Sequence, residues 1–131
     1  MENRDKNLIE MRPALNLSPT SGAMEQFQNE TLRPILKFQN ELLLKICHHQ
    51  FVKRKSTFFQ LPQIEQLGYI EQQVSRDQNF KNLLLGIIAG HFTSVDWLFF
   101  KEHEQDVRKR MTSLLIQRIQ SQCSLLTSDF N

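Results

Sequence analysis

The stretch LRPILKFQNELLLKICHHQFV, residues 32–52, decides the fold. Apolar side chains cover most of the circumference of the helix that this stretch predicts, among them Ile35, Leu36, Leu42, Leu43, Ile46 and Cys47. Polar residues at spacings of three and four form one narrow stripe, which consists of Lys37, Glu41, Lys45 and His48. This pattern predicts a central helix that other helices surround on all sides except the stripe.

Pro34 determines where that helix is expected to begin. Proline has no backbone N–H and suits the first turn of a helix. Helical pattern is already visible from Ala23, so Pro34 predicts a kink or a restart near Thr31.

The composition of the whole chain is that of a helical protein. Its 131 residues include only four glycines and four prolines. Leu, Gln, Lys and Glu are common, whereas strand-favouring Val and Tyr are rare. We therefore expect an all-α, single-domain bundle of five to six helices. Residues 1–22 would be an N-terminal arm with a short helix and a loop, and residues 23–127 the helical bundle.

Local signals predict where the later helices begin. Pro62 and Asp77 each suit the start of a helix. Thr93 and Asp96 resemble a capping box, with Asp in place of the usual Glu. The last helix is expected over residues 104–126.

Charge and hydropathy argue against two classes of partner. Sixteen basic and fourteen acidic side chains are mostly interspersed, so the field needed for nonspecific nucleic-acid binding should be weak. The most apolar stretch, residues 83–100, contains no clean run near the ~20 residues that span a bilayer. The N-terminus lacks the apolar core of a signal peptide, so we expect a cytoplasmic protein.

The sequence contains no catalytic motif and no metal-binding motif. It lacks a glycine-rich phosphate loop and a GxSxG turn. Cys47, His48 and His49 look like a ligand cluster, but neighbours on a helix point ~100° apart and cannot converge on one ion. We expect no metal and no cofactor, and an enzyme is the less favoured reading.

Arg118 is the most informative single residue. On a helical wheel it falls within the apolar stripe of the last helix, which consists of Val107, Met111, Leu114, Leu115, Leu125 and Leu126. A buried guanidinium without a partner is costly. The partner would be an acid such as Glu30, Glu71 or Glu104, or a bound anion. Alternatively, the side chain extends along the apolar surface and places its charged group in water at the edge of the bundle.

Two further polar residues, Gln39 and His91, fall in apolar surroundings. Each can be satisfied structurally within a helical bundle. If both face one cavity with Arg118, the three would form a polar pocket for a small anion or carboxylate. We carry Arg118, Gln39 and His91 as candidate ligand-binding residues.

The run Trp97-Leu98-Phe99-Phe100 cannot hide all of its bulky side chains on one helix face. Trp97, Phe99 and Phe100 are therefore candidate interface residues, and two-fold pairing is the commonest form of self-association. The main functional hypothesis is a noncatalytic interaction module that binds a second copy of itself or another protein. Binding of a small anion is the alternative.

Three stretches resemble a group of small bacterial all-helical proteins of unknown function. They are ETLRPILKFQNELL at residues 30–43, GHFT at 90–93 and RMTSLLIQR at 110–118. The resemblance implies a bacterial cytoplasmic helical domain. Some of these proteins carry the label glyoxalase, which adds a glyoxalase-like enzyme as a third hypothesis. Glyoxalase I proteins, however, are built from paired βαβββ modules with metal ligands on strands, whereas this composition predicts helices alone.

Overall fold

A computed structural model describes residues 2–15, 22–54 and 57–127, and within these ranges the chain is helical with no strand. The helices are α1 (Glu2–Met11), α2 (Ala23–Phe27), α3 (Arg33–Phe38), α4 (Asn40–Lys53), α5 (Gln63–Arg76), α6 (Gln78–Ala89), α7 (Ser94–Glu102), α8 (Glu104–Ser121) and α9 (Cys123–Leu126). A π-helical turn, η1 (Gln28–Leu32), joins α2 to α3, and a 3₁₀ turn, η2 (Phe58–Gln60), precedes α5. The all-α expectation is confirmed.

The described helical segments outnumber the five to six that were expected. Gln39 interrupts the helix predicted over residues 32–52, and Gln122 interrupts the one predicted over residues 104–126. Both residues depart from helical backbone angles, with φ −92° and ψ 8° at Gln39 and φ −118° and ψ 25° at Gln122. The loop expected before Gly22 falls on residues 17–21, outside the described residues.

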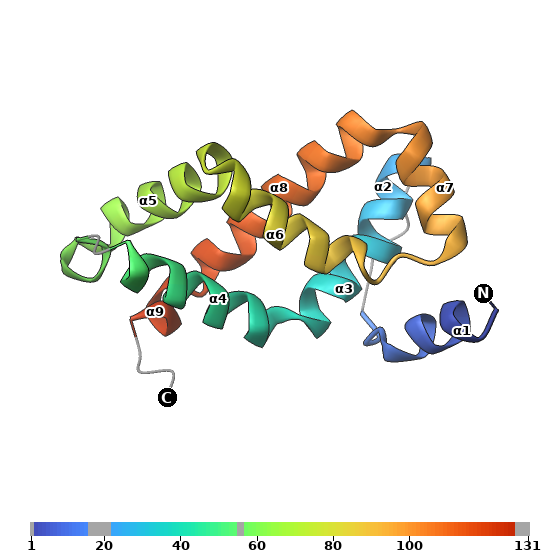
Figure 1. The fold of residues 1–131 in the computed structure, drawn as a ribbon, viewed down its shortest axis with the longest axis horizontal. Helices are drawn as coiled ribbons and strands as arrows, with labels where there is room; N and C mark the ends of the chain where they lie inside the picture. The colour runs from blue at the N-terminus through green and yellow to red at the C-terminus, as the bar shows by residue number, and fades with distance from the viewer. Residues whose placement is uncertain (1, 16–21, 55–56, 128–131) are drawn as a thin grey trace.

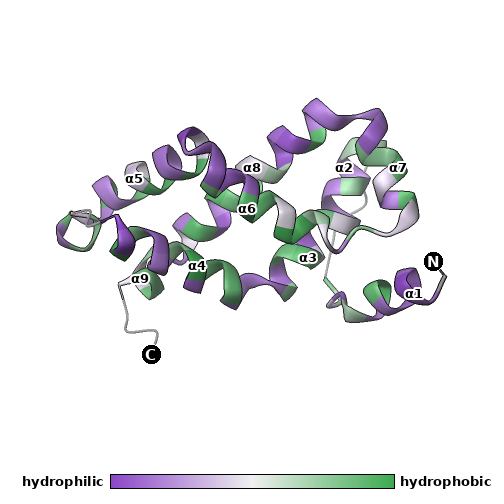
Figure 2. Cartoon of the chain, in the orientation of Figure 1, coloured by the Kyte–Doolittle hydropathy of each residue, from purple (hydrophilic) through white to green (hydrophobic). Residues whose placement is uncertain are grey.

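Helices α4, α5, α6 and α8 form the body of the bundle (Figure 1). Helix α8 crosses behind α6 and contacts both α5 and α6, while α9 contacts α4. Helices α2 and α7 lie together at one end, and α1 lies outside the body at that end. In Figure 2, α4 and α6 are hydrophobic over much of their length, whereas the first turns of α8 are hydrophilic.

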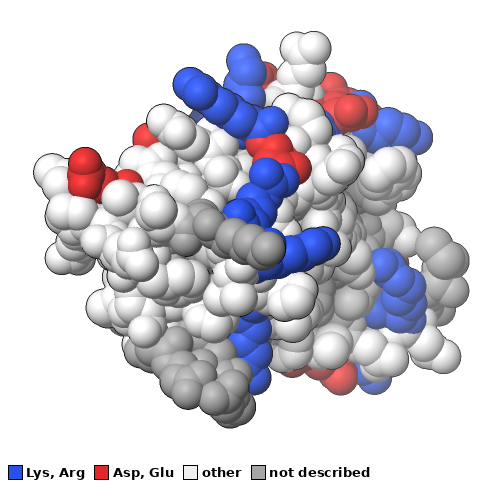
Figure 3. Space-filling model, turned by 60° about the vertical axis from the view of Figure 1, so that its left-hand side comes forward, with Lys and Arg blue, Asp and Glu red and all other residues white. Residues whose placement is uncertain are grey.

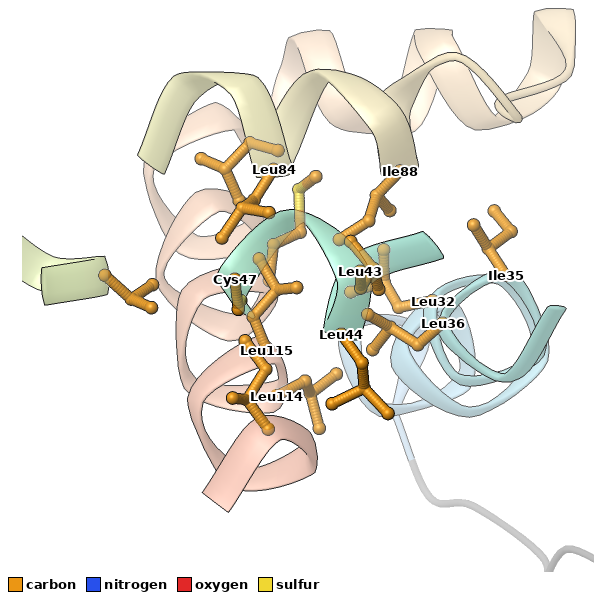
Figure 4. Packing of buried hydrophobic residues seen from close by; sticks show 14 of the residues in the cluster. Leu32, Ile35, Leu36, Leu43, Leu44, Cys47, Leu84, Ile88, Leu114 and Leu115 are labelled. Carbon is orange, nitrogen blue, oxygen red and sulfur yellow. The ribbon is translucent and has the colours of Figure 1, made fainter. Parts of the chain in front are cut away.

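The core lies where α3, α4, α6 and α8 meet (Figure 4). Leu43 and Cys47 of α4 are buried against Leu115 of α8 and Leu84 of α6. Completely buried leucine side chains contribute on the order of 2 kcal/mol each relative to exposure. Apolar burial therefore holds the four helices together and fixes the polar residues between them.

The solvent-exposed stripe of the central helix is confirmed in large part. Lys37, Glu41 and Lys45 are exposed, and Lys45 pairs with Glu41 at 3.1 Å. His48 is half-buried, and Leu42, which was expected in the apolar arc, is exposed. Because the helix is interrupted at Gln39, the residues after it are rotated about the helix axis relative to those before it. A helical wheel drawn for one continuous helix therefore places Leu42 on the wrong face.

Pro34 acts through the turn that precedes it. The Arg33 amide donates to the carbonyl of Gln28, five residues back, as in a π-helix. Proline cannot donate, and in a regular α-helix its ring would clash with the carbonyl four residues back. The wider π turn continues the chain from α2 into α3 without a restart at Thr31.

Both predicted caps are confirmed. Asp77 accepts a hydrogen bond from the Phe80 amide at 3.1 Å at the start of α6. Thr93 and Asp96 form a reciprocal capping box at the start of α7.

Polar contacts hold α1 against the corner between α6 and α7. The guanidinium groups of Arg4 and Arg12 donate to the backbone carbonyls of residues 90–92 at 2.8 to 3.1 Å. Asp5 accepts from the Ser94 amide at 3.0 Å. The arm is thus attached through charged side chains on the main chain of the corner.

Asp96 connects this arm to the bundle. Its carboxylate is buried and contacts Arg12 at 2.5 Å, the Thr93 amide at 2.9 Å and the Thr31 hydroxyl at 3.1 Å. One carboxylate therefore links α1, η1 and α7.

Neutralising Asp96 should destabilise the fold. Asp96→Asn leaves the Arg12 side chain, which is only 11% exposed, without its counter-charge. We expect a loss of about 3 kcal/mol in the free energy of unfolding, measured by urea denaturation. The double variant Asp96→Asn with Arg12→Met should lose clearly less than the sum of the two single losses. Additive losses would contradict the coupling.

Candidate functional site

Arg118 projects from α8 and is half-buried. Its NH1 donates to the side-chain oxygen of Asn40 at 3.1 Å. None of the ion pairs in the described part of the chain involves Arg118, so Glu30, Glu71 and Glu104 do not neutralise it. The guanidinium is held by a neutral carboxamide.

A pair of carboxamides fixes this partner. Asn40 and Gln122 each donate to the other's side-chain oxygen at 2.7 Å. Gln122 also donates to the backbone carbonyl of Arg118 at 3.1 Å. The two interruptions in the helical backbone lie at Gln39 and Gln122, so the residues that orient Arg118 lie at or next to these sites.

A second arginine, Arg33, lies near Arg118. Its Nε donates to the Asn29 side-chain oxygen at 2.9 Å, within the π turn. Burial lowers the pKa of Arg118, and the positive charge of Arg33 lowers it further. The charge of Arg33 therefore acts unfavourably on the charged form of Arg118.

The two arginines line one hollow of about 280 Å³ between α3 and α8. Its lining consists of Arg33, Leu36, Leu114, Gln117, Arg118, Ser121 and Gln122. We call it the arginine hollow. It contains basic, amide, hydroxyl and apolar side chains and no carboxylate.

A third arginine shares the same kind of partner. Arg110 of α8 donates to the side-chain oxygen of Gln28 at 2.8 Å. Arg110, Arg33 and Arg118 are thus each hydrogen-bonded to a carboxamide along the seam between α8 and the η1–α4 segment. An amide oxygen accepts a hydrogen bond but carries no net charge, so positive charge remains along the seam.

On the face drawn in Figure 3, basic side chains gather along the middle, with acidic side chains among and around them.

Gln39 and His91 come together, but Arg118 does not join them. The Gln39 amide nitrogen lies 2.8 Å from Nε2 of His91, and the Phe38 ring packs edge-on to the imidazole. Neither Gln39 nor His91 lines the arginine hollow. The predicted three-residue pocket therefore divides into two separate clusters, and the ligand role of Gln39 and His91 stays a prediction.

The aromatic run of α7 is distributed over several environments. Trp97 is 51% exposed, whereas Phe100 is 8% exposed and belongs to the chain's own core. Phe99 is half-buried and stacks on Phe27 with ring centroids 4.6 Å apart. Trp97 and the equally exposed Leu98 line an apolar hollow of about 420 Å³. Phe100 is therefore not free for an interface.

The two cysteines are buried free thiols. Burial raises the pKa of Cys47 to about 12, so this thiol stays protonated. Cys123 donates to the Gln66 side-chain oxygen at 3.3 Å.

Within the described ranges, no three His, Cys, Asp or Glu side chains gather where they could hold a metal ion. No helix in these ranges has the length and apolar character needed to cross a membrane.

The pKa of His91 predicts a stability that depends on pH. Burial lowers this pKa below 6.5, and the charges of Arg12 and Arg4 lower it further. On acidification through 6.5 the unfolded chain takes up a proton before the folded chain does, so the free energy of unfolding falls.

When the pH is lowered from about 7 to about 5, we expect the free energy of unfolding of His91→Gln to fall by less than that of the wild type. Urea denaturation at each pH measures it. The other histidines are common to both proteins and cancel in the comparison. Parallel pH profiles would contradict the assignment.

Neither a protein-family model nor a curated protein nor a solved structure matches the chain.

Proposed function

We propose that the protein binds a small anion in the arginine hollow. The observation that carries the proposal is the half-buried guanidinium of Arg118, which has an amide partner and lies near a second arginine. An anion between Arg33 and Arg118 would compensate both charges.

A purely structural role accounts less well for this arrangement. A structural arginine at such a position is best matched by a carboxylate, which compensates its charge as well as its hydrogen bonds. Here the lining contains no acid, and the positive charge of Arg33 acts against that of Arg118. The fold thus bears the repulsion between two cations, and a bound anion converts that repulsion into attraction.

Hydrogen-bonding capacity supports the same conclusion. A guanidinium has five N–H donors in a planar fork that suits carboxylate and phosphate oxygens. Arg118 uses NH1 for Asn40, and Arg33 uses Nε for Asn29. Each arginine keeps further donors for a ligand.

The amide partners also orient the two arginines before a ligand arrives. Asn40 is itself held by two hydrogen bonds with Gln122, and Asn29 is part of the π turn. Preorganised donors raise affinity because less side-chain entropy is lost on binding.

Removing Arg118 should weaken anion binding selectively. We expect wild-type protein to bind inorganic phosphate in a calorimetric titration and Arg118→Met to bind at least about tenfold more weakly. Circular dichroism would check that the variant is folded. Should it unfold, Arg118→Lys keeps the charge and loses the fork, and the same weakening is expected.

Arg108→Met is the matched control. Arg108 lies on the same helix and also donates to a carboxamide, that of Asn82, at 3.1 Å, but it is outside the arginine hollow. The control variant should bind phosphate as the wild type does. Equal weakening in both variants would show only a general effect of net charge.

A second candidate function is a homodimeric interaction module. The specific support for it is the pair Trp97 and Leu98, which are both 51% exposed and line an apolar hollow beside Arg4. Exposed apolar patches with an aromatic anchor are characteristic of protein interfaces.

Polar substitution of this pair should abolish self-association. We expect wild-type protein to be dimeric in native mass spectrometry at tens of micromolar, and Trp97→Ser with Leu98→Ser to be monomeric. Ile64→Ser removes an equally apolar side chain, 79% exposed on α5, and should leave the dimer intact. A monomeric wild type, or a dimer that survives the double substitution, would exclude this interface.

A further inference from the structure

We propose that helix α1 is a pH-sensitive strap, which leaves the corner between α6 and α7 when His91 takes up a proton. Two observations carry the proposal: charged side chains attach α1 to this corner, and His91 lies among them. The proposal is independent of the arginine hollow, which lies between α3 and α8.

The polar contacts that attach α1 to the corner are made by charged side chains. Arg4 and Arg12 donate to the backbone carbonyls of residues 90–92, and Asp5 accepts from the Ser94 amide at 3.0 Å. The strength of such contacts depends on the other charges nearby.

Apolar packing adds little to this attachment. Ile9 and Met11 are 51% and 46% exposed, and no residue of α1 belongs to the buried core of the described chain. A helix of ten residues is only marginally stable by itself in water. We therefore expect α1 to lose its helical hydrogen bonds when it leaves the corner.

His91 lies in this corner as a neutral imidazole. The Gln39 amide nitrogen lies 2.8 Å from Nε2 of the buried His91 ring, and the uncharged Phe38 packs edge-on to it. An amide N–H can only donate, so Nε2 accepts and carries no proton. A protonated imidazole has an N–H on both ring nitrogens, and it would lose this contact as it stands.

Charged groups face this corner from α1 and from α7. Burial lowers the pKa of His91, and the positive charges of Arg12 and Arg4 lower it further. Two carboxylates are already paired with these arginines, Asp96 of α7 with Arg12 at 2.5 Å and Asp5 with Arg4 at 3.8 Å. A proton on His91 is therefore repelled by the guanidinium groups that hold α1 in place.

This repulsion acts in both directions. Because docked α1 disfavours the proton on His91, that proton disfavours docked α1 by the same free energy. Release of α1 takes Arg4 and Arg12 away from the ring, so the released form should take up the proton more readily. Acidification below the ordinary histidine pKa of 6.5 therefore shifts the equilibrium towards release.

Release of α1 would also change a neighbouring surface. Arg4 is the residue that α1 contributes to the lining of the apolar hollow beside Trp97 and Leu98. When α1 leaves, this charged side of the hollow leaves with it.

Hydrogen exchange on the intact chain tests the strap. The measurement is the protection factor of each amide at about pH 7 and about pH 5, corrected for the intrinsic exchange rate at each pH. We expect the amides of α1 to lose protection by about threefold or more on acidification, because the released helix unfolds. Carboxyl groups ordinarily titrate at about pH 4, so a change in this range is assigned to a histidine.

His91→Gln removes the sensor, and His49→Gln is the matched control. His49 is an exposed histidine on α4. The fall in α1 protection should disappear in His91→Gln and persist in His49→Gln. Should His91→Gln fail to fold, NMR titration of the wild-type His91 ring should give a protonation curve that coincides with the fall in α1 protection.

Three results would overturn the proposal. Constant protection of α1 while the amides of the core lose protection would show that the proton on His91 acts on the whole fold and not on the strap. An equal fall in His91→Gln would assign the effect to another group. A protonation curve of His91 that does not coincide with the loss of α1 protection would separate the two events.

Discussion

The carboxamide of Asn40 is the contact that positions Arg118 in the arginine hollow. Its oxygen accepts hydrogen bonds from Arg118 and from Gln122, and its nitrogen donates back to Gln122. Asn40 begins α4 immediately after the interruption at Gln39. The contact therefore joins the start of α4 to the end of α8, on the side of the bundle where the two arginines meet.

The residues that stabilise the fold differ from those that would bind an anion. Apolar side chains of α4, α6 and α8 form the buried core (Figure 4), and the contacts of Asp96 connect α1, η1 and α7. The arginines of the seam add little that an apolar residue of similar size could not supply. Their amide partners accept hydrogen bonds but do not compensate the positive charge. This arrangement is expected of a site that binds an anion.

The sequence predicts the features that depend on composition and on residues close together in the chain. Composition predicts the all-α class, the caps at Asp77 and Thr93 depend on residues three positions apart, and the helical wheel identifies Arg118 as a residue in unusual surroundings. The sequence alone does not predict that Asn40 accepts a hydrogen bond from Arg118, because these residues are 78 positions apart. Nor does it predict which aromatic side chain of α7 points inward, because that depends on how the helix packs. The helix interruption at Gln39 carries no Gly or Pro signal at that position.

The most direct test of the central claim is a crystal structure of the protein grown with inorganic phosphate. We expect the phosphate to lie between the guanidinium groups of Arg33 and Arg118. An arginine hollow that contains only water, or a ligand bound elsewhere while Arg118 keeps Asn40 as its sole partner, would contradict it.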